Sequence, residues 1–337
     1  MDLTTKHFLL LGAGFSRNWG GWVASEAFEY LLGCPEIMAD ERLRKLLWVH
    51  QAHQLGGGFE SALAELQNNV TTWASQPWSD SQLVNFQNAI GRMFTAMNQA
   101  FLNRNDLEFQ RNDPQRMIRT FLARFESIFT LNQDILMEHF YLVDNVARAT
   151  VRPYVPGMRH TPSAEPMHSQ SLSRAAWTPR QPGEFKLQSD SQAFFKLHGS
   201  SNWFADDGQR VLIMGGGKRQ AIERFPILSW YAQQFEASLL QPNARLMIIG
   251  YGFADPHINE VIKNAVASGL RIFVINPEGA MLAFTLNDTR RPAHIADPSD
   301  PKEVMLQTSL IGGSRRLLRE IFTTDDAEFS KVMRFFD

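Results

Sequence analysis

The residues of this chain that could carry chemistry follow five short apolar segments, at the point where each segment ends. These polar and glycine-containing stretches are residues 12–17, 132–134, 198–200, 250–255 and 276–278. If the apolar segments are parallel strands of one sheet, their carboxyl ends open onto a shared crevice, which is where such sheets bind ligands. We therefore expect a single site built from all five stretches.

The first stretch, GAGFSR, contains the glycine pair Gly12 and Gly14. Glycines in a strand-to-helix turn let backbone N–H groups approach a pyrophosphate, and the helix N-terminus behind them favours negative charge. Ser16 and Arg17 add a hydroxyl and a fork-shaped cation for phosphate oxygens. The alternative is a tight turn without a ligand. The third glycine and the acidic residue of the usual dinucleotide-binding pattern are missing, which disfavours an ordinary dehydrogenase.

Two other residues at these ends, and one glycine-rich stretch outside them, each have a purely structural alternative. His198 ends an apolar segment and precedes a glycine, so a role in the site and a structural role both stay open. Asp255 precedes Pro256, which is typical of a helix N-cap, and we favour that interpretation over support of the site. The stretch GGGK at 215–218 lacks the phosphate-loop pattern and favours a hairpin or flexible turn. No histidine has metal-ligand spacing, so no metal site is expected.

Apolar segments alternate with helix-like segments along the chain. We expect strands over 7–12, 127–131, 193–198, 244–253 and 270–279, and a strand-like run that enters the glycine turn at 211–218. Helices are expected over most of 20–127, with one over 113–126, and again over 305–337. This alternation predicts an α/β fold with a Rossmann-like parallel sheet. The core comprises 1–19 and 120–337, and a large helical insertion, 20–119, follows the first strand.

Length and composition are those of a globular chain. The 337 residues are 44% hydrophobic and 20% charged, with a formal net charge of −2. A protein that bound nucleic acid through phosphates would be visibly basic, so no direct nucleic-acid binding is expected. Cys34, the single cysteine, excludes a multi-cysteine metal site. No apolar run reaches the ~18 residues of a membrane span, and no signal-peptide cleavage pattern is present, so we expect a cytoplasmic protein.

The order of the motifs GAGFS, TLNQD, KLHG and VIN resembles the sirtuin family over residues 6–18 and 125–280. The resemblance implies NAD+ as substrate. It places Asn132 and Asp134 at the nicotinamide ribose, identifies His198 as the catalytic histidine and puts Asn276 at the adenosine ribose. The residues it implies for cofactor binding, taken with the glycine-rich turns, are Gly12, Ala13, Gly14, Ser16, Arg17, Gly250 and Asn276.

Two departures from the sirtuin pattern point to one branch of the family. A single cysteine cannot form the four-cysteine zinc module of deacetylating sirtuins, and SRNWGG replaces their G-I-P-D-F-R segment. The elements FES at 59–61 and GYGFADPHIN at 250–259 are similar to sirtuin-like domains of bacterial anti-phage defence. That branch hydrolyses NAD+ outright, which implies a glycohydrolase that releases nicotinamide and ADP-ribose in abortive infection. Protein deacylation and a non-enzymatic, nucleotide-sensing subunit are the alternatives.

Control of such an activity implies assembly, because a constitutive NADase would poison its own cell. The resemblance implies a HerA-type ring ATPase as a separate partner chain, and a homo-oligomer is expected. The helical insertion and the proline-rich segment 150–192 are candidate contact regions. That segment could be a lid, a partner-binding arm or an irregular flap.

Overall fold

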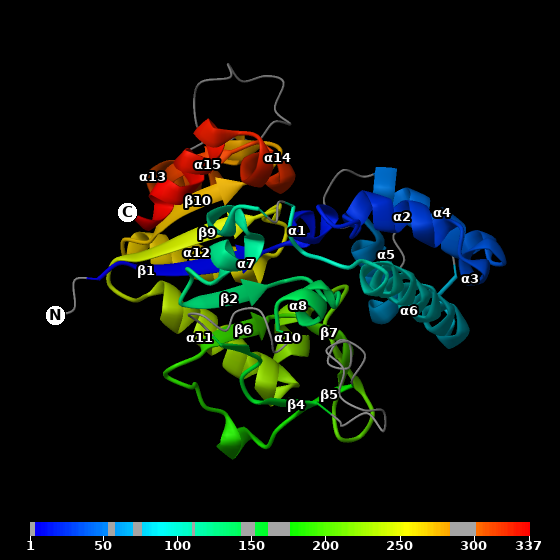
Figure 1. The fold of residues 1–337 in the computed structure, drawn as a ribbon. Coiled ribbons are helices and arrows are strands. Elements are labelled where there is room, and N and C mark those ends of the chain that lie inside the picture. Colours follow the sequence, from blue (N-terminus) through cyan, green and yellow to red (C-terminus); the bar gives the residue numbers. More distant parts are fainter. Residues whose placement is uncertain are drawn as a thin grey trace.

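The fold is organised around one parallel sheet of seven strands in the order β11-β10-β9-β1-β2-β6-β3 (Figure 1). The computed structural model describes residues 4–52, 58–69, 76–109, 112–142, 152–160, 176–283 and 301–337. Every neighbouring pair in the sheet is parallel, so the expected α/β fold with a Rossmann-like sheet is confirmed. The strands are β1 (Lys6–Leu11), β2 (Ser127–Thr130), β3 (Pro153–Tyr154), β6 (Gln192–Lys196), β9 (Ala244–Ile249), β10 (Arg271–Ile275) and β11 (Leu310–Ser314).

The strand order reverses at β1. Strands β2, β6 and β3 lie on one side of it, and β9, β10 and β11 lie on the other. Connections that leave a central strand in opposite directions open a crevice at the carboxyl ends of the strands. The glycine turn after β1 and the glycine turn after β9 meet at this point.

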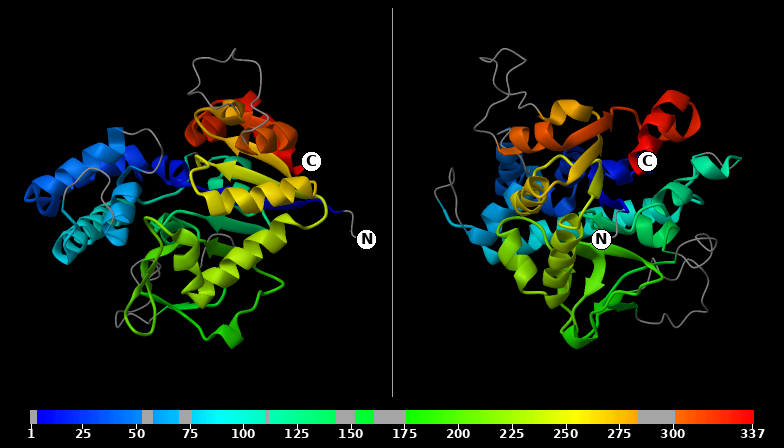
Figure 2. Two further views of the ribbon diagram at one scale, coloured as in Figure 1. Left: turned by 180° about the vertical axis from the view of Figure 1, so that it is seen from behind. Right: turned by 90° about the vertical axis from the view of Figure 1, so that its left-hand side faces the viewer.

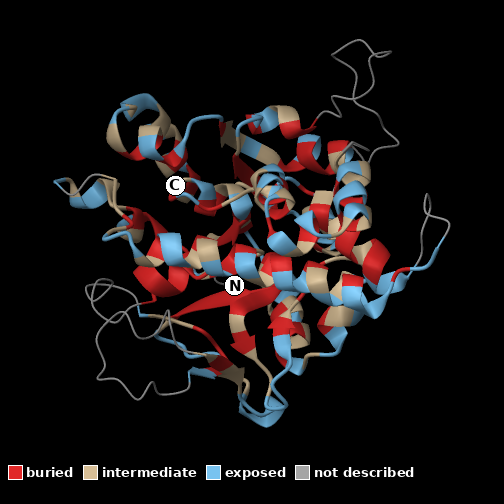
Figure 3. Ribbon diagram, turned by 90° about the vertical axis from the view of Figure 1, so that its right-hand side faces the viewer, coloured by how far each residue is buried: buried red, intermediate tan, exposed pale blue. Residues whose placement is uncertain are grey.

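Both faces of the sheet are covered, which explains why its strands are apolar runs rather than alternating patterns (Figure 3). Phe129 on β2 contacts Phe235 of α11, while Phe273 on β10 contacts Phe335 on the opposite face. Helices α11 and α12 cover the face seen in the left panel of Figure 2. The flanking helices are α7 (Ile118–Leu122), α8 (Leu136–Phe140), α10 (Lys218–Glu223), α11 (Pro226–Leu239), α12 (Pro256–Ala267), α13 (Pro301–Ser309), α14 (Leu318–Thr323) and α15 (Asp326–Met333).

Helices α2 to α6 extend from the sheet on the side away from both termini (Figure 1). The longest, α6, begins at a capping box in which Ser79 accepts the Gln82 backbone N–H, and it buries an apolar stripe that includes Phe86 and Met93. The bounds after β1 are α1 (Ala13–Arg17), α2 (Ala24–Leu32), α3 (Pro35–Met38), α4 (Glu41–Ala52), α5 (Gly58–Asn68) and α6 (Asp80–Leu102). The limits of a separate helical domain stay a prediction.

Parts of the sequence-based assignment are wrong. The segment 305–337 is not all helical, because β11 adds a strand beside β10. The segment 113–126 holds only short helices, which end at Leu122 before β2 begins. A second sheet, β4-β5-β7-β8, was not expected; it uses β4 (Met158–His160), β5 (Trp177–Pro179), β7 (Gly199–Phe204) and β8 (Arg210–Leu212). The remainder of 150–192 lies partly outside the described residues.

Short 3-10 helices complete the described elements: η1 (Pro114–Arg116), η2 (Pro182–Glu184), η3 (Gly279–Ala283) and η4 (Arg334–Phe336). Within the described ranges, none of the helices combines the length and the apolar character needed to cross a membrane.

The turns after β1 and β9 touch through their backbones. The N–H of Gly14 donates to the carbonyl of Gly250 at 2.9 Å. A Cβ on Gly12 would lie 2.5 Å from the carbonyl oxygen of Gly250, and one on Gly250 would lie 2.4 Å from the backbone of Gly14. Gly250 also has φ +66°, a conformation that side chains disfavour. Both positions therefore need glycine.

We expect Gly250→Ala to destabilise the protein by about 3 kcal/mol or more, because the methyl group overlaps backbone atoms and the residue is left-handed. Gly252→Ala is the matched control, since a Cβ there meets nothing within 4 Å. Urea unfolding midpoints followed by circular dichroism measure the difference. Equal midpoints for the two variants would contradict the steric argument.

Candidate active site

All five expected strand ends line one cavity of ≈ 760 Å³, a volume typical of small-molecule sites. Each stretch contributes at least one residue: Gly12, Asn132, His198, Gly250 and Asn276. The helical insertion supplies another wall through α5 and α6, and the segment after β11 adds Arg315 to Arg319. The expectation of one shared crevice is therefore confirmed.

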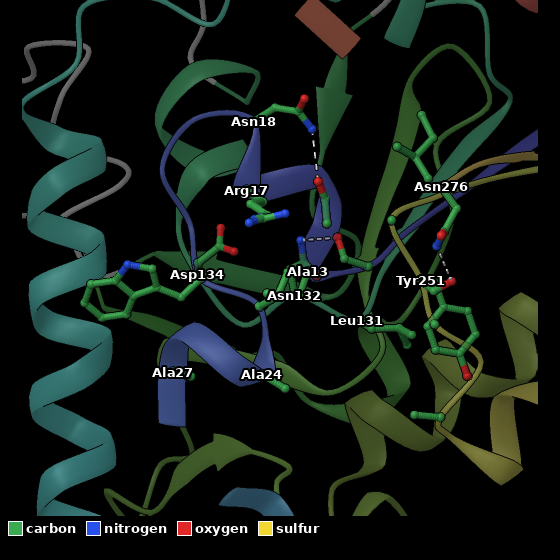
Figure 4. A pocket seen from close by; sticks show the side chains of 18 of the residues that line it. Ala13, Arg17, Asn18, Ala24, Ala27, Leu131, Asn132, Asp134, Tyr251 and Asn276 are labelled. Carbon is green, nitrogen blue, oxygen red and sulfur yellow. Dashed lines mark hydrogen bonds between the residues drawn. The ribbon is translucent and has the colours of Figure 1, made fainter. Parts of the chain in front are cut away.

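Asn132, two residues beyond the end of β2, is held in place through its amide nitrogen. Nδ2 donates to the carbonyl of Gly12 and to the Ser16 hydroxyl, both at 2.9 Å (Figure 4). A carbonyl can only accept, so the Gly12 contact sets which end of the amide faces it. Both amide hydrogens are then used inside the protein. The Oδ1 atom of Asn132 is left as an acceptor for a hydroxyl or a water in the cavity.

Ser16 and Asp134 form the support beneath Asn132. The buried Ser16 hydroxyl donates to Oδ2 of Asp134 at 2.7 Å, and Oδ1 of Asp134 accepts the Leu136 N–H at 3.0 Å. Asp134 lines the cavity but Ser16 does not. The hydroxyl expected to bind phosphate therefore holds the Asp134 carboxylate instead in this structure.

The glycine turn uses much of its own hydrogen-bonding capacity. The N–H groups of Gly12 and Gly14 donate to the carbonyls of Ile249 and Gly250. Ala13, between them, lines the cavity. Gly12 and Gly14 thus contribute close approach of the backbone rather than free N–H groups.

Arg17 and Asn276 line the cavity in positions that already have partners. The Arg17 guanidinium pairs with Glu26 of α2 at 2.9 Å. Asn276, after β10, donates to the carbonyl of Tyr251 at 3.3 Å and accepts the Glu278 N–H at 3.1 Å. In the view of Figure 4, Asn132 lies between Asp134 and Asn276. One N–H of the Asn276 amide remains for a ligand.

His198 lies in the turn between β6 and β7, two residues beyond the end of β6. The turn requires Gly199, which has φ +73° and whose Cβ would lie 1.9 Å from the Val211 carbonyl oxygen. The His198 carbonyl accepts the N–H of Ile213 at 2.9 Å, so the residue that follows β8 holds the turn in place. The His198 side chain is buried and reaches the cavity.

A cluster of charged residues that the sequence did not predict lies beside His198. Nζ of Lys218 is 2.6 Å from both Glu60 of α5 and Asp255, and Nε2 of His257 is 3.0 Å from Nε2 of His198. Asp255 precedes α12 as expected, but its side chain makes no capping hydrogen bond. Asp255 is therefore the N-cap residue of α12 by position, as favoured, but its carboxylate binds Lys218 rather than the backbone of the helix.

The stretch GGGK is a packed turn rather than a flexible one. A Cβ on Gly215 would lie 2.4 Å from the Gln67 side chain, and one on Gly216 would lie 2.9 Å from Ala64, both on α5. This packing places Lys218 beside Glu60 of the same helix, α5. The residues of this cluster belong to the stretches GGGK (215–218), FES (59–61) and ADPH (254–257). The spacing of these stretches along the chain does not show that they meet.

Burial and neighbouring charge set the protonation of this cluster. Burial, followed by repulsion from the Lys218 ammonium, lowers the pKa of His198 to about 3, and the same two effects lower the pKa of His257. Burial alone would raise the pKa of Asp255, but attraction to His198 and Lys218 holds it below the ordinary value. Both histidines are therefore neutral near pH 7, so each has one ring nitrogen that can accept a hydrogen bond.

His198, Asp255 and His257 also offer three metal-ligating atoms within 4.8 Å of one another. No spacing in the sequence indicates this grouping, because the two histidines are 59 residues apart. The Lys218 ammonium at 2.6 Å already supplies a cation to Asp255. A divalent ion would add charge beside that ammonium, so the geometry favours a hydrogen-bonded cluster over a metal centre.

The chain matches a family of known domains. The family model described as SIR2-like domain matches residues 126–294, which is half of the chain. A solved structure from work on the mechanism and regulation of Sir2 enzymes covers 98% of this chain and 93% of its own, with 11% identity and a TM-score of 0.35. No curated protein matches the sequence.

The buried neutral His198 predicts a loss of stability in acid. Its pKa of about 3 lies below the ordinary value of about 6.5 for an unfolded chain. The unfolded state therefore binds the extra proton as pH falls below about 6.5, and the free energy of unfolding drops by about 2 kcal/mol between pH 7 and pH 5 from this group.

Urea unfolding at both pH values measures this drop. The drop in the free energy of unfolding should be about 2 kcal/mol smaller in His198→Gln than in the wild type. The drop should stay unchanged in the control His160→Gln, whose side chain is exposed. The same drop in both variants would show that His198 is not the group responsible.

Proposed function

The chain belongs to the SIR2-like family, a family of NAD-dependent enzymes, and from that premise we propose that it is an NAD+ glycohydrolase. It cleaves the bond between nicotinamide and ribose and releases nicotinamide and ADP-ribose. The proposed role is depletion of cytoplasmic NAD+ in abortive anti-phage defence. NAD+ is the substrate, and the proposed reaction needs no metal.

One observation carries this proposal. Strands β2 and β6 are hydrogen-bonded neighbours, so Asn132 and His198 emerge side by side from their carboxyl ends into one cavity. Asn132 presents an acceptor oxygen, and His198 is an uncharged base. Asp134, held by Ser16 and the Leu136 N–H, adds a fixed carboxylate. An acceptor, a base and a negative charge are what activation of water at a cationic sugar requires.

The leaving group explains why no strong acid is needed. The nicotinamide of NAD+ is positively charged and departs neutral, unlike the leaving group of a common glycosidase. The ribose passes through an oxocarbenium-like state, which the Asp134 carboxylate stabilises. Asn132 Oδ1 orients the water or a ribose hydroxyl, and His198 takes up the proton. Ala13, Arg17, Gly250 and Asn276 border the space for the diphosphate and the adenosine.

A time course of NAD+ loss and nicotinamide release tests the proposal. We expect Asn132→Ala and His198→Ala each to lower turnover by about 10²-fold or more, because each removes a group that acts in the transition state. Matched controls are Asn103→Ala and His160→Ala, which change the same residue types at exposed positions.

Other outcomes assign other functions. NAD+ that binds to the wild type but is not cleaved, alone or with an ATPase partner, would support a nucleotide-sensing subunit. NAD-dependent loss of an acyl group from a lysine peptide would support a deacylase. Hydrolysis that survives both site variants would place the reaction elsewhere.

We further propose that assembly controls the activity, through a homo-oligomer and a HerA-type ATPase supplied as a separate chain. Large apolar side chains on the insertion support this proposal: Met38 is 62% exposed, Trp48 52% and Val84 50%. Exposed apolar residues of this size are candidate contacts with other chains.

Trp48→Glu should weaken self-association and lower specific activity at a given concentration, because the charge disfavours burial of that surface. Light scattering after gel filtration and NADase assays over a dilution series measure both. Leu240→Glu, which alters a residue of similar exposure at the end of α11, is the control. Equal turnover by dilute monomer and by the assembled protein would contradict control by assembly.

A further inference from the structure

His198, which lines the cavity, contacts a second histidine, His257, behind it. Nε2 of His198 lies 3.0 Å from Nε2 of His257, and the ring centroids are 5.1 Å apart. Each neutral imidazole carries one N–H and one acceptor nitrogen, so one Nε2 donates and the other accepts. His198 is buried, whereas His257, in the first turn of α12, is partly exposed.

The loop before α12, the helix that carries His257, is fixed by its own hydrogen bonds. The Tyr251 hydroxyl donates to Oδ1 of Asn259 at 2.9 Å and accepts the Asp255 N–H at 3.0 Å. Nδ2 of Asn259 donates to the carbonyl of Phe253, a bulky residue with φ 57°. Such a left-handed conformation persists only where neighbours enforce it. His257 is thus positioned before any ligand arrives.

The charged groups that face the pair are one ammonium and the two carboxyl groups on either side of it. Lys218 lies between two carboxylates, Glu60 and Asp255, at 2.6 Å from each. Arg219, at the start of α10, pairs with Glu260 at 3.2 Å and is balanced by it. A positive charge that forms on His198 is attracted by the Asp255 carboxylate and repelled more strongly by the Lys218 ammonium, so a hydrogen bond rather than the surrounding charge must support it.

The proposed hydrolysis itself makes such a positive charge. Water forms a bond to C1′ of the ribose, and the C1′–N bond breaks with its electron pair going to the nicotinamide nitrogen. One hydrogen of the water stays in the new hydroxyl group, and the neutral nicotinamide takes none. Each turnover therefore releases one proton, which His198 accepts first.

We propose that His257 is the positioning residue of His198: its Nε2 accepts the Nε2–H of His198, which keeps Nδ1 of His198 free to take the proton. This inference rests on the proposed hydrolase activity. His257 fixes the tautomer and the ring orientation, and it stabilises the imidazolium that forms, as a buried acceptor does for the histidine of a hydrolase triad. After the products leave, Nδ1 returns its proton to water.

Steady-state kinetics of three variants test the inference. His257→Leu removes the acceptor and should lower kcat by about 10²-fold with little change in KM, because the ring acts through His198 rather than through substrate. His257→Gln has an amide oxygen that can accept the same hydrogen bond, so it should restore part of the loss. His160→Leu, at an exposed position, should match the wild type. Equal kcat for His257→Leu and the wild type would overturn the inference.

Nitrogen NMR of ¹⁵N-histidine-labelled full-length protein gives a readout without turnover. We expect His198 to be the Nε2–H tautomer in the wild type and in His257→Gln, and a mixture of tautomers in His257→Leu. A wild type that leaves NAD+ intact would defeat the hydrolase proposal while this spectrum still tests the histidine pair. An Nδ1–H tautomer for His198 in the wild type would overturn the inference that His257 accepts the Nε2–H of His198.

A zinc titration distinguishes a hydrogen-bonded histidine pair from a metal centre. The wild type titrated with Zn²⁺ should show no stoichiometric change of the His198 and His257 signals. Equimolar binding that shifts both signals and is lost in His257→Leu would show that the cluster holds a metal, and would overturn the inference. If His257→Leu does not fold, His257→Gln is compared with the wild type in the same titration.

Discussion

The contact between the turns after β1 and β9 is the constraint on which the site depends. Two chain segments more than 200 residues apart approach until the N–H of Gly14 donates to the carbonyl of Gly250, and no side chain fits between them. This contact lies where the strand order of the sheet reverses. It fixes the floor of the cavity and sets where Gly12 can receive the Asn132 amide.

The second organising feature is a set of buried and partly buried polar contacts around the cavity. Asn132, Ser16 and Asp134 bind one another, and Asn276 binds the turn that contains Tyr251. Buried polar groups that lack partners are costly, so these contacts stabilise one arrangement of the strand ends. They also leave Asn132 Oδ1 as an acceptor, which limits the contacts that Asn132 can make with a substrate.

The helical insertion is part of the site rather than an appendage. Its α5 supplies Glu60, which shares Lys218 with Asp255, and Asp255 precedes the helix that carries His257. Two carboxylates surround one mostly buried ammonium. Removal of one of these groups would destabilise the protein, because it leaves a charge without its partner. The position of the insertion and the electrostatics of His198 are therefore linked by direct contacts.

The sequence by itself determined the parallel sheet, most of its strands and the five ends that form the cavity. Buried parallel strands read as apolar runs, and their polar ends converge by topology alone. It missed β11, whose glycines look unlike a strand, and the small second sheet, whose strands are short. Only the tertiary structure decided that Ser16 binds Asp134, that Asp255 binds Lys218, and that His257 meets His198. Those contacts join residues 37 to 118 positions apart, and no local periodicity encodes such distances.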